Sequence, residues 1–179
     1  MKKRYILGSV LTILIMFNGC ANSDEDDKDE QEHSREHHSS SPALPEGLEP
    51  APNPTFKEGS QVILKANHMD GMEGAKATVL NAYNTIAYEV TYTPTTSGDK
   101  VTNHKWVIQD EIKDAGSEML EKGTEVVLEA DHMEGMKGAK AEIEDAENTT
   151  VYMVDYESTE DGEMITNHRW LTEGEVFAE

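Results

Sequence analysis

Cysteine, aromatic side chains and basic residues are all scarce in this 179-residue sequence. The single cysteine, Cys20, excludes an internal disulfide and any cluster of thiolate ligands. Lys and Arg number 15 against 36 Asp and Glu, which gives a formal net charge of −21. Such a charge repels nucleic acid and anionic lipid head groups, and it attracts cations. The composition therefore argues against nucleic acid as a partner, and it fits either simple solubility or the concentration of cations.

Motifs of catalysis are also missing from the sequence. It contains no serine elbow, no paired nucleophile and base, and no pair of carboxylates that stands out from the general acidity. The Cys-His-Met set of a blue-copper centre is absent as well. We therefore expect a binding protein and not an enzyme.

The N-terminus is typical of an export signal. Basic residues 2–4 precede an apolar run at residues 5–17, which is too short to span a membrane. The run ends in Phe17-Asn18-Gly19-Cys20, which resembles the lipobox of bacterial lipoproteins. We expect residues 1–19 to be a lipoprotein signal peptide, Cys20 to be lipidated, and the protein to lie at the extracytoplasmic face of the cell membrane. A plain secretory signal and an uncleaved short anchor are the alternatives.

Residues 20–55 are typical of a disordered, lipid-anchored linker. Acidic residues come first, histidine and serine follow, and five prolines are spread over the last part. Low hydrophobicity combined with high charge cannot support a packed core. His33, His37 and His38 lie in this segment. They are either a weak secondary metal-binding set or polar residues of a solvated linker.

A duplication organises the rest of the chain. Residues 59–112 and 123–176 align without a gap at a spacing of 64, and 25 of the 54 paired positions are identical. We expect two repeat domains, 56–114 and 115–179. Each repeat shows short runs of alternating apolar and polar residues between glycine-rich turns. These runs predict separate strands, for example at 75–80 and 87–92 in the first repeat. The pattern predicts an all-β fold of two tandem small SH3-like β-barrels, because barrel closure hides the sheet edges.

Histidine and methionine recur at fixed places in both repeats. Each repeat has a His-Met-x-Gly-Met motif and, further on, an Asn-His-basic-Trp motif. Imidazole and thioether are the ligands that suit copper(I) when thiolates are absent. The tryptophan follows the second histidine by two positions and is placed to cover a bound cation by a cation–π contact. The predicted ligands are His68, Met69, Met72 and His104 in the first repeat and His132, Met133, Met136 and His168 in the second, with Trp106 and Trp170 as the cation–π residues.

Other interpretations of these residues stay open at this point. Methionine is a common filler of apolar cores, a turn histidine can simply be hydrogen-bonded, and each tryptophan can be the anchor of a small core. Zinc is a competing ion if Asp70 or Glu134 joins the histidines, and copper(II) is another if the acidic linker takes part. The metal interpretation is favoured because 29 of the 54 paired positions differ, whereas every histidine and both motif methionines are unchanged.

The doubled motif, together with the lipobox and the acidic linker, resembles the YdhK-type lipoproteins of Gram-positive bacteria and, within them, the CopL copper-binding lipoproteins. This resemblance implies a membrane-tethered protein that sequesters copper(I), contributes to copper resistance and works near a copper-exporting ATPase. The alternative is a module that binds the cell wall or a surface protein through Tyr88, Tyr92, Trp106 and their repeat partners, with no metal role.

Overall fold

The computed structural model describes residues 44–179. The predicted signal peptide, the lipidation site Cys20 and the linker histidines His33, His37 and His38 lie outside the described residues. Within residues 44–179, no helix combines the length and the apolar character needed to cross a membrane.

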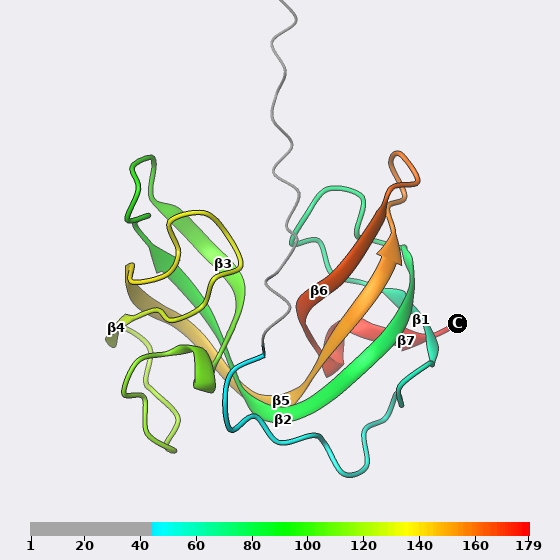
Figure 1. Cartoon of the computed structure of the whole chain (residues 1–179), viewed down its shortest axis with the longest axis horizontal. Coiled ribbons are helices and arrows are strands. Elements are labelled where there is room, and N and C mark those ends of the chain that lie inside the picture. Colours follow the sequence, from blue (N-terminus) through cyan, green and yellow to red (C-terminus); the bar gives the residue numbers. More distant parts are fainter. Residues whose placement is uncertain (1–43) are drawn as a thin grey trace, which may run out of the picture. The chain divides into compact units, whose positions relative to one another are not determined.

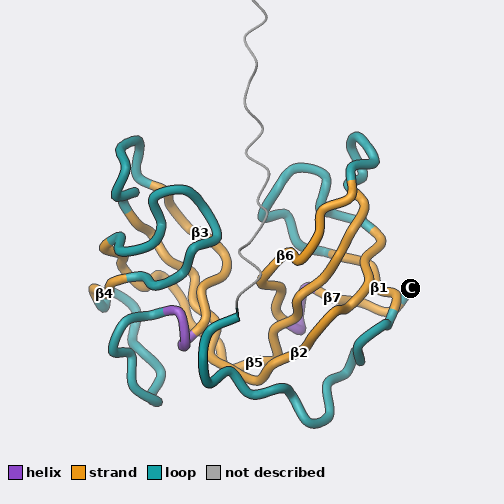
Figure 2. Tube along the Cα trace, in the orientation of Figure 1, coloured by secondary structure: helices purple, strands orange, loops and turns teal. Residues whose placement is uncertain are grey.

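Two long antiparallel strands, β2 (Lys76–Tyr92) and β5 (Lys140–Glu157), form the centre of the fold and run side by side (Figure 1). The sheet order is β4-β5-β2-β1-β7, while β3 pairs with β2 and β6 pairs with β5. The only helices of the described residues are two short 3-10 turns (Figure 2). The all-β prediction is confirmed, and the SH3-like topology stays a prediction. The remaining elements are β1 (Gln61–Leu64), β3 (Val101–Ile108), η1 (Gln109–Glu111), β4 (Glu125–Val127), β6 (Met164–Thr172), η2 (Glu173–Glu175) and β7 (Val176–Ala178).

The strands build two lobes, and each lobe takes half of its core from each repeat. Lobe 1 contains β1, the first half of β2, the second half of β5, β6, η2 and β7, so that Leu64 packs in one core with Tyr156. Lobe 2 contains β4, the first half of β5, the second half of β2, β3 and η1, so that Leu128 packs in one core with Tyr92. One barrel per repeat would require each lobe to coincide with one repeat. The lobes do not, because each core contains residues of both repeats.

The physical reason lies in the length of the two central strands. The sequence pattern predicted separate strands at 75–80 and 87–92. Residues 81–86 contain neither glycine nor proline, however, and β2 runs through them without a break, with a total length of 17 residues. At about 3.3 Å per residue such a strand is roughly 55 Å long. One strand of this length spans both lobes, and so each repeat donates its second half to the other lobe.

The pairing of β2 with β5 has an approximate two-fold symmetry. Thr85 faces Thr149, and these two residues occupy equivalent positions of the two repeats. The register also shifts at two equivalent places, once at Leu80 of β2 and once at Glu144 of β5. An antiparallel contact between equivalent surfaces is the arrangement of an isologous dimer, here contained in one chain.

A third core lies over the middle of the long strands, where Tyr83 of β2 packs with Val151 of β5 and with both tryptophans. Leu44 and Leu48 pack against this cluster. Pro50 forms a β-bridge with Tyr83, and the next amide, that of Ala51, donates a 2.9 Å hydrogen bond to the carbonyl of Ala82. The prediction of a disordered linker as far as residue 55 is therefore wrong for residues 44–55, because two leucines between the prolines supply apolar contacts.

Candidate metal-binding pocket

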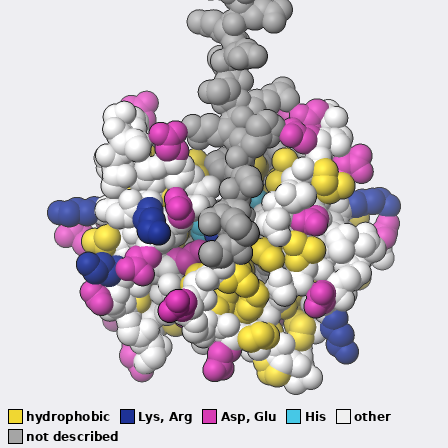
Figure 3. Space-filling model, in the orientation of Figure 1, with side chains coloured by type: hydrophobic (Ala, Val, Ile, Leu, Met, Phe, Trp, Pro, Cys, Tyr) yellow, Lys and Arg dark blue, Asp and Glu magenta, His cyan; other side chains and the backbone are white. Residues whose placement is uncertain are grey.

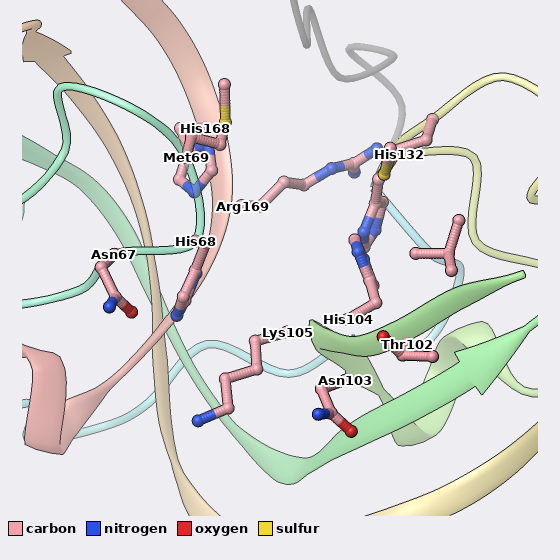
Figure 4. Close-up of a pocket in the computed structure, with 12 residues that line it drawn as sticks. Asn67, His68, Met69, Thr102, Asn103, His104, Lys105, His132, His168 and Arg169 are labelled. Atoms are coloured by element: carbon pink, nitrogen blue, oxygen red, sulfur yellow. The ribbon is translucent and has the colours of Figure 1, made fainter. Parts of the chain in front are cut away.

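A cavity of about 330 Å³ brings together six of the eight predicted ligands (Figure 4). Two pairs come from the loops that follow β1 and β4, and two single histidines come from β3 and β6. Its other lining residues are polar or basic, with one apolar valine. The six ligands in the lining are His68, Met69, His104, His132, Met133 and His168, and they are accompanied by Asn67, Val101, Thr102, Asn103, Lys105 and Arg169.

In lobe 2 the cavity wall combines the loop of the second repeat with a strand of the first. The ring centroids of His104 and His132 are 6.1 Å apart. Tyr92 lies edge-on to His104 at 5.9 Å, and its hydroxyl donates to the sulfur of Met133 at 3.6 Å. The second-repeat motif thus meets His104 of the first repeat and not its own downstream histidine.

Lobe 1 repeats this arrangement with the roles of the repeats exchanged. Tyr156 lies edge-on to His168 with ring centroids 5.6 Å apart, and its hydroxyl is 4.0 Å from the sulfur of Met69. Burial raises the pKa of Tyr156 to about 12, so the phenol stays protonated and donates towards the sulfur. Figure 4 shows Met69 and His168 close together on one side of the cavity, and His132 near His104 on the other.

The asparagine before each strand histidine has a structural role. Asn103 and Asn167 both have a φ of 54°, in the left-handed region that asparagine tolerates better than most residues. Each lies where the strand register shifts, between Val90 and Tyr92 for β3 and at the equivalent place for β6. Because a β-bulge re-aims the following side chain, it accounts for the repeated Asn-His pair.

Met72 and Met136, the last residues of the two motifs, do not line the cavity. Both have an exposed fraction of 0 % and pack in the cores of lobe 1 and lobe 2, respectively. Each accepts a backbone hydrogen bond from the alanine three positions later, at 3.0 Å for Met72 and 2.9 Å for Met136. The core interpretation therefore describes these two methionines, whereas Met69 and Met133 have their sulfurs at the cavity.

The tryptophans are core residues as well. Trp106 and Trp170 belong to the third core, both follow a cis peptide bond, and neither lines the cavity. The cations over their rings belong to the chain itself, with Lys105 Nζ 4.9 Å from the centroid of Trp106 and Arg169 Cζ 5.7 Å from that of Trp170. The expected indole cover over a bound metal is therefore not the role of these rings.

Two glutamates that the sequence motifs did not indicate, Glu111, which is buried, and Glu175, which is half-buried, hold the loop histidines. Glu175 Oε1 lies 2.7 Å from Nε2 of His68, and Glu111 Oε1 lies 2.7 Å from Nε2 of His132. The signal was present, because Glu111 and Glu175 are an identical pair at the spacing of 64. In a chain with 36 acidic residues that one identity did not stand out.

Both carboxyl groups are held in the ionised form. Burial raises the pKa of Glu111, but the charge and hydrogen bond of His132 outweigh it, helped by N–H groups of Ile108 and Trp170, and the pKa ends below its ordinary value. The pKa of Glu175 is lowered in the same way, because the hydrogen bond and charge of His68 outweigh burial. An ionised carboxylate behind an imidazole is the usual outer partner of a metal-binding histidine.

Among residues 44–179, no group of three or more His, Cys, Asp or Glu side chains is placed to hold one metal ion. Asp70 and Glu134, the carboxylates considered for zinc, are exposed and do not line the cavity. A site here would depend on the thioethers of Met69 and Met133 together with imidazoles. This donor set fits copper(I) better than zinc.

Each motif loop is pinned by a hairpin of the other repeat. The carbonyl of Gly71 accepts a 2.9 Å hydrogen bond from the amide of Thr159, and that of Gly135 accepts one of 2.8 Å from Thr95. Gly135 has a φ of 74°, and a Cβ there would lie 2.6 Å from Thr96 Oγ1 and 3.0 Å from Pro94 Cβ. The glycine thus permits both the turn and the close approach.

Replacing this glycine tests the close approach. Gly135→Ala is expected to lower the free energy of unfolding by about 3 kcal/mol, because positive φ and overpacking add together. Gly138→Ala is the control, since Gly138 has a φ of 80° but its Cβ would meet nothing nearer than 3.9 Å. That variant should lose only about 1 kcal/mol. Urea denaturation measures both, and equal losses would contradict the packing described for Gly135.

Comparison with known proteins shows the family of this chain. The sequence pattern of one family, described as a protein of unknown function (DUF1541), matches it twice, at residues 58–109 and 122–173. This chain belongs to the DUF1541 family. Both DUF1541 matches contain a motif loop and a strand histidine, and each ends two residues before the glutamate that holds a loop histidine. The prediction of two tandem repeats is confirmed.

Relatives within DUF1541 include the uncharacterized protein YdhK of Bacillus subtilis (strain 168), which is 51 % identical over 183 residues, covering 98 % of this chain and 89 % of YdhK. A crystal structure of YdhK at 2.00 Å matches with a TM-score of 0.79 and 58 % identity over 82 % of this chain and all of that one. A solution structure of the YdhK C-terminal domain matches with a TM-score of 0.66 and 61 % identity over 69 % of this chain and 94 % of that one. The resemblance to YdhK-type proteins is confirmed, and the likeness to CopL stays a prediction.

Proposed function

We propose that this protein binds copper(I) through the histidines and methionines of the cavity, holds it outside the cell and so contributes to copper resistance. The observation that carries the proposal is the convergence of four imidazoles and two thioethers on one cavity. Thioether and imidazole together suit copper(I), and thioethers are poor ligands for zinc. Zinc and copper(II) are the competing ions and are expected to bind more weakly.

The charge of the protein supports capture of a cation. The chain has a formal net charge of −21, and acidic side chains are spread over both lobes on the face shown in Figure 3. A negative field raises the local concentration of cations and speeds their encounter with the protein. The field does not select one metal, so selectivity rests with the soft ligands of the cavity.

The proposal includes a lipid anchor at Cys20, which keeps the cavity at the extracytoplasmic face of the membrane. A copper-exporting ATPase is the expected neighbour there, because the ion that it releases outside the cell is the ion that the cavity takes. No catalytic activity is part of the proposal. The protein acts as a buffer that lowers the concentration of free copper.

The alternative of a wall-binding module loses its support from the described side chains. It relied on Tyr88, Tyr92 and Trp106 as a gripping surface, and these have exposed fractions of 0 %, 1 % and 7 %. Rings buried to this degree do not present a face to a polymer. They stabilise the cores and, in the case of Tyr92, orient the sulfur of Met133.

A competition titration tests the proposed function. Purified protein (residues 21–179) is mixed under anaerobic conditions with copper(I) and a chromogenic copper(I) chelator. We expect up to two equivalents to be withdrawn from the chelator, because the cavity contains two His-Met sets, one from each lobe. Zinc added in excess should not displace the copper. Failure to withdraw copper(I), with binding to isolated cell wall instead, would sink the proposal.

A further inference from the structure

We infer that Glu111 and Glu175 are positioning residues that present Nδ1, and not Nε2, of His132 and His68 to the metal. The inference rests on the proposed function, and it names the ligand atom and the groups that set it. It concerns residues outside both predicted motifs.

The clearest observation is at His68. Its side chain is 6 % exposed, and its Nε2 lies 2.7 Å from Oε1 of Glu175. An ionised carboxylate only accepts, so Nε2 carries a hydrogen, and in the neutral imidazole, the form that binds a metal, Nδ1 keeps its lone pair. That Nδ1 is buried and has no hydrogen-bond partner among the described residues. A buried acceptor without a partner is costly, and a soft cation in the cavity would satisfy it.

The second loop histidine has the same arrangement. His132 Nε2 lies 2.7 Å from Oε1 of Glu111, and the two side chains are 6 % and 5 % exposed. The carboxylate again fixes the hydrogen on Nε2. His132 lines the cavity together with His104, and the centroids of the two rings are 6.1 Å apart.

Each glutamate is itself fixed from the opposite lobe. Trp106 of β3 in lobe 2 donates from Nε1 to Oε2 of Glu175 in lobe 1 at 2.8 Å, and the amide of Thr172 donates to the same oxygen at 3.0 Å. One carboxylate oxygen therefore holds the imidazole, while the other is held by the frame of the protein. Because the carboxylate is fixed in this way, the imidazole of His68 cannot turn without losing its hydrogen bond to Glu175.

The reciprocal contact completes the pair. Trp170 of β6 in lobe 1 donates from Nε1 to Oε2 of Glu111 in lobe 2 at 3.0 Å, and the amide of Ile108 donates to it at 3.2 Å. Each tryptophan thus forms a hydrogen bond between the lobes, and through its glutamate it helps to orient one loop histidine. This explains why tryptophan and glutamate are unchanged between the repeats although neither lines the cavity.

Glutamine variants separate positioning from a purely structural ion pair. In Glu175→Gln the amide oxygen can still accept from Trp106 and Thr172, while the amide nitrogen faces His68 and donates to Nε2. The imidazole hydrogen then moves to Nδ1, which can no longer bind a metal without losing it. We expect copper(I) affinity to fall about 10- to 100-fold in Glu175→Gln and in Glu111→Gln.

Matched controls remove the same charge close by. Glu173→Gln alters the same 3-10 turn as Glu175, and Asp110→Asn alters the same turn as Glu111, at side chains that do not line the cavity. Both control variants should bind copper(I) as the unaltered protein does. A loss of affinity equal to that of the Glu175 and Glu111 variants would assign the effect to charge and overturn the inference.

Nitrogen NMR of the imidazoles reads out the ligand atom, because copper(I) is diamagnetic. In ¹⁵N-labelled protein we expect His68 and His132 to be protonated at Nε2 before copper is added, and their Nδ1 resonances to shift with copper(I). If copper(I) shifts Nε2 instead, or if the glutamine variants keep full affinity, this inference is overturned while the proposed function stands. If copper(I) shifts no imidazole resonance in any form of the protein, both are overturned.

Discussion

Cutting the chain between Gly116 and Ser117 is expected to leave both fragments in one folded particle. These residues are exposed and lie between the repeats, so a protease site inserted there is accessible. Neither fragment contains a complete core, since lobe 1 needs Leu64 together with Tyr156 and lobe 2 needs Leu128 together with Tyr92. The association of the fragments therefore has the free energy of folding itself, about 5–15 kcal/mol. Light scattering after size-exclusion chromatography measures the mass of the particle.

The uncut insertion variant is the control for this experiment. A chain limited to residues 56–114 is expected to lack fixed tertiary structure as a monomer, because half of each core is missing. Circular dichroism and proton NMR dispersion report this directly. If the cut fragments separate and each remains folded as a monomer, then each repeat closes its own barrel and the exchange of halves does not occur in solution.

The second large effect concerns the methionines. Met69→Leu combined with Met133→Leu is expected to lower copper(I) affinity by about a hundredfold or more, because loss of a direct ligand exceeds the 10- to 100-fold effect of an outer partner. Both sulfurs lie at the cavity beside a tyrosine hydroxyl. Leucine keeps the volume and removes the thioether. Competition with a copper(I) chelator gives the affinity, and thermal denaturation confirms that the variant is folded.

The chain supplies its own matched control for this test. Met72→Leu combined with Met136→Leu makes the same chemical change in the same two motifs, but at residues buried in the cores. We expect unchanged copper(I) affinity and a loss of less than about 1.5 kcal/mol of stability for each substitution. Equal affinity losses in the two double variants would mean that the motif acts through packing and not through its cavity sulfurs.

Local patterns in the sequence correctly predicted the features that depend on neighbouring residues, namely the strands, the turns and the repeat. Strand alternation and glycine turns indicated an all-β chain, and identity at a spacing of 64 indicated the repeat and most of the residues in the cavity. The exchange of halves was missed because it depends on a choice between continuing and turning at residues 81–86, where no proline or glycine decides it. The separation of Met69 from Met72 was missed because residue type alone does not say which thioether faces a core.

The two glutamates that hold the loop histidines show a different limit of prediction from sequence. Glu111 contacts a histidine more than 20 positions away in the sequence, and Glu175 contacts one more than 100 positions away. Only the folded chain brings each glutamate next to its histidine. A repeat comparison restricted to unusual residue types overlooks them. The useful signal was an acidic residue kept identical where neighbouring acidic positions vary, as Asp110 and Gly174 do.

Because the two repeats exchange their second halves, a closed monomer needs an even number of repeats. The long strand of each repeat places its second half in the lobe of the other repeat, so each repeat needs a partner that does the same. Thr85 pairs with Thr149 near the middle of the two strands, where one lobe gives way to the other. Two repeats satisfy each other completely. Three would leave one unit with an unpaired long strand and an open core, and one would need a second molecule. The gene can therefore gain or lose these units only in pairs if the protein is to remain a closed monomer.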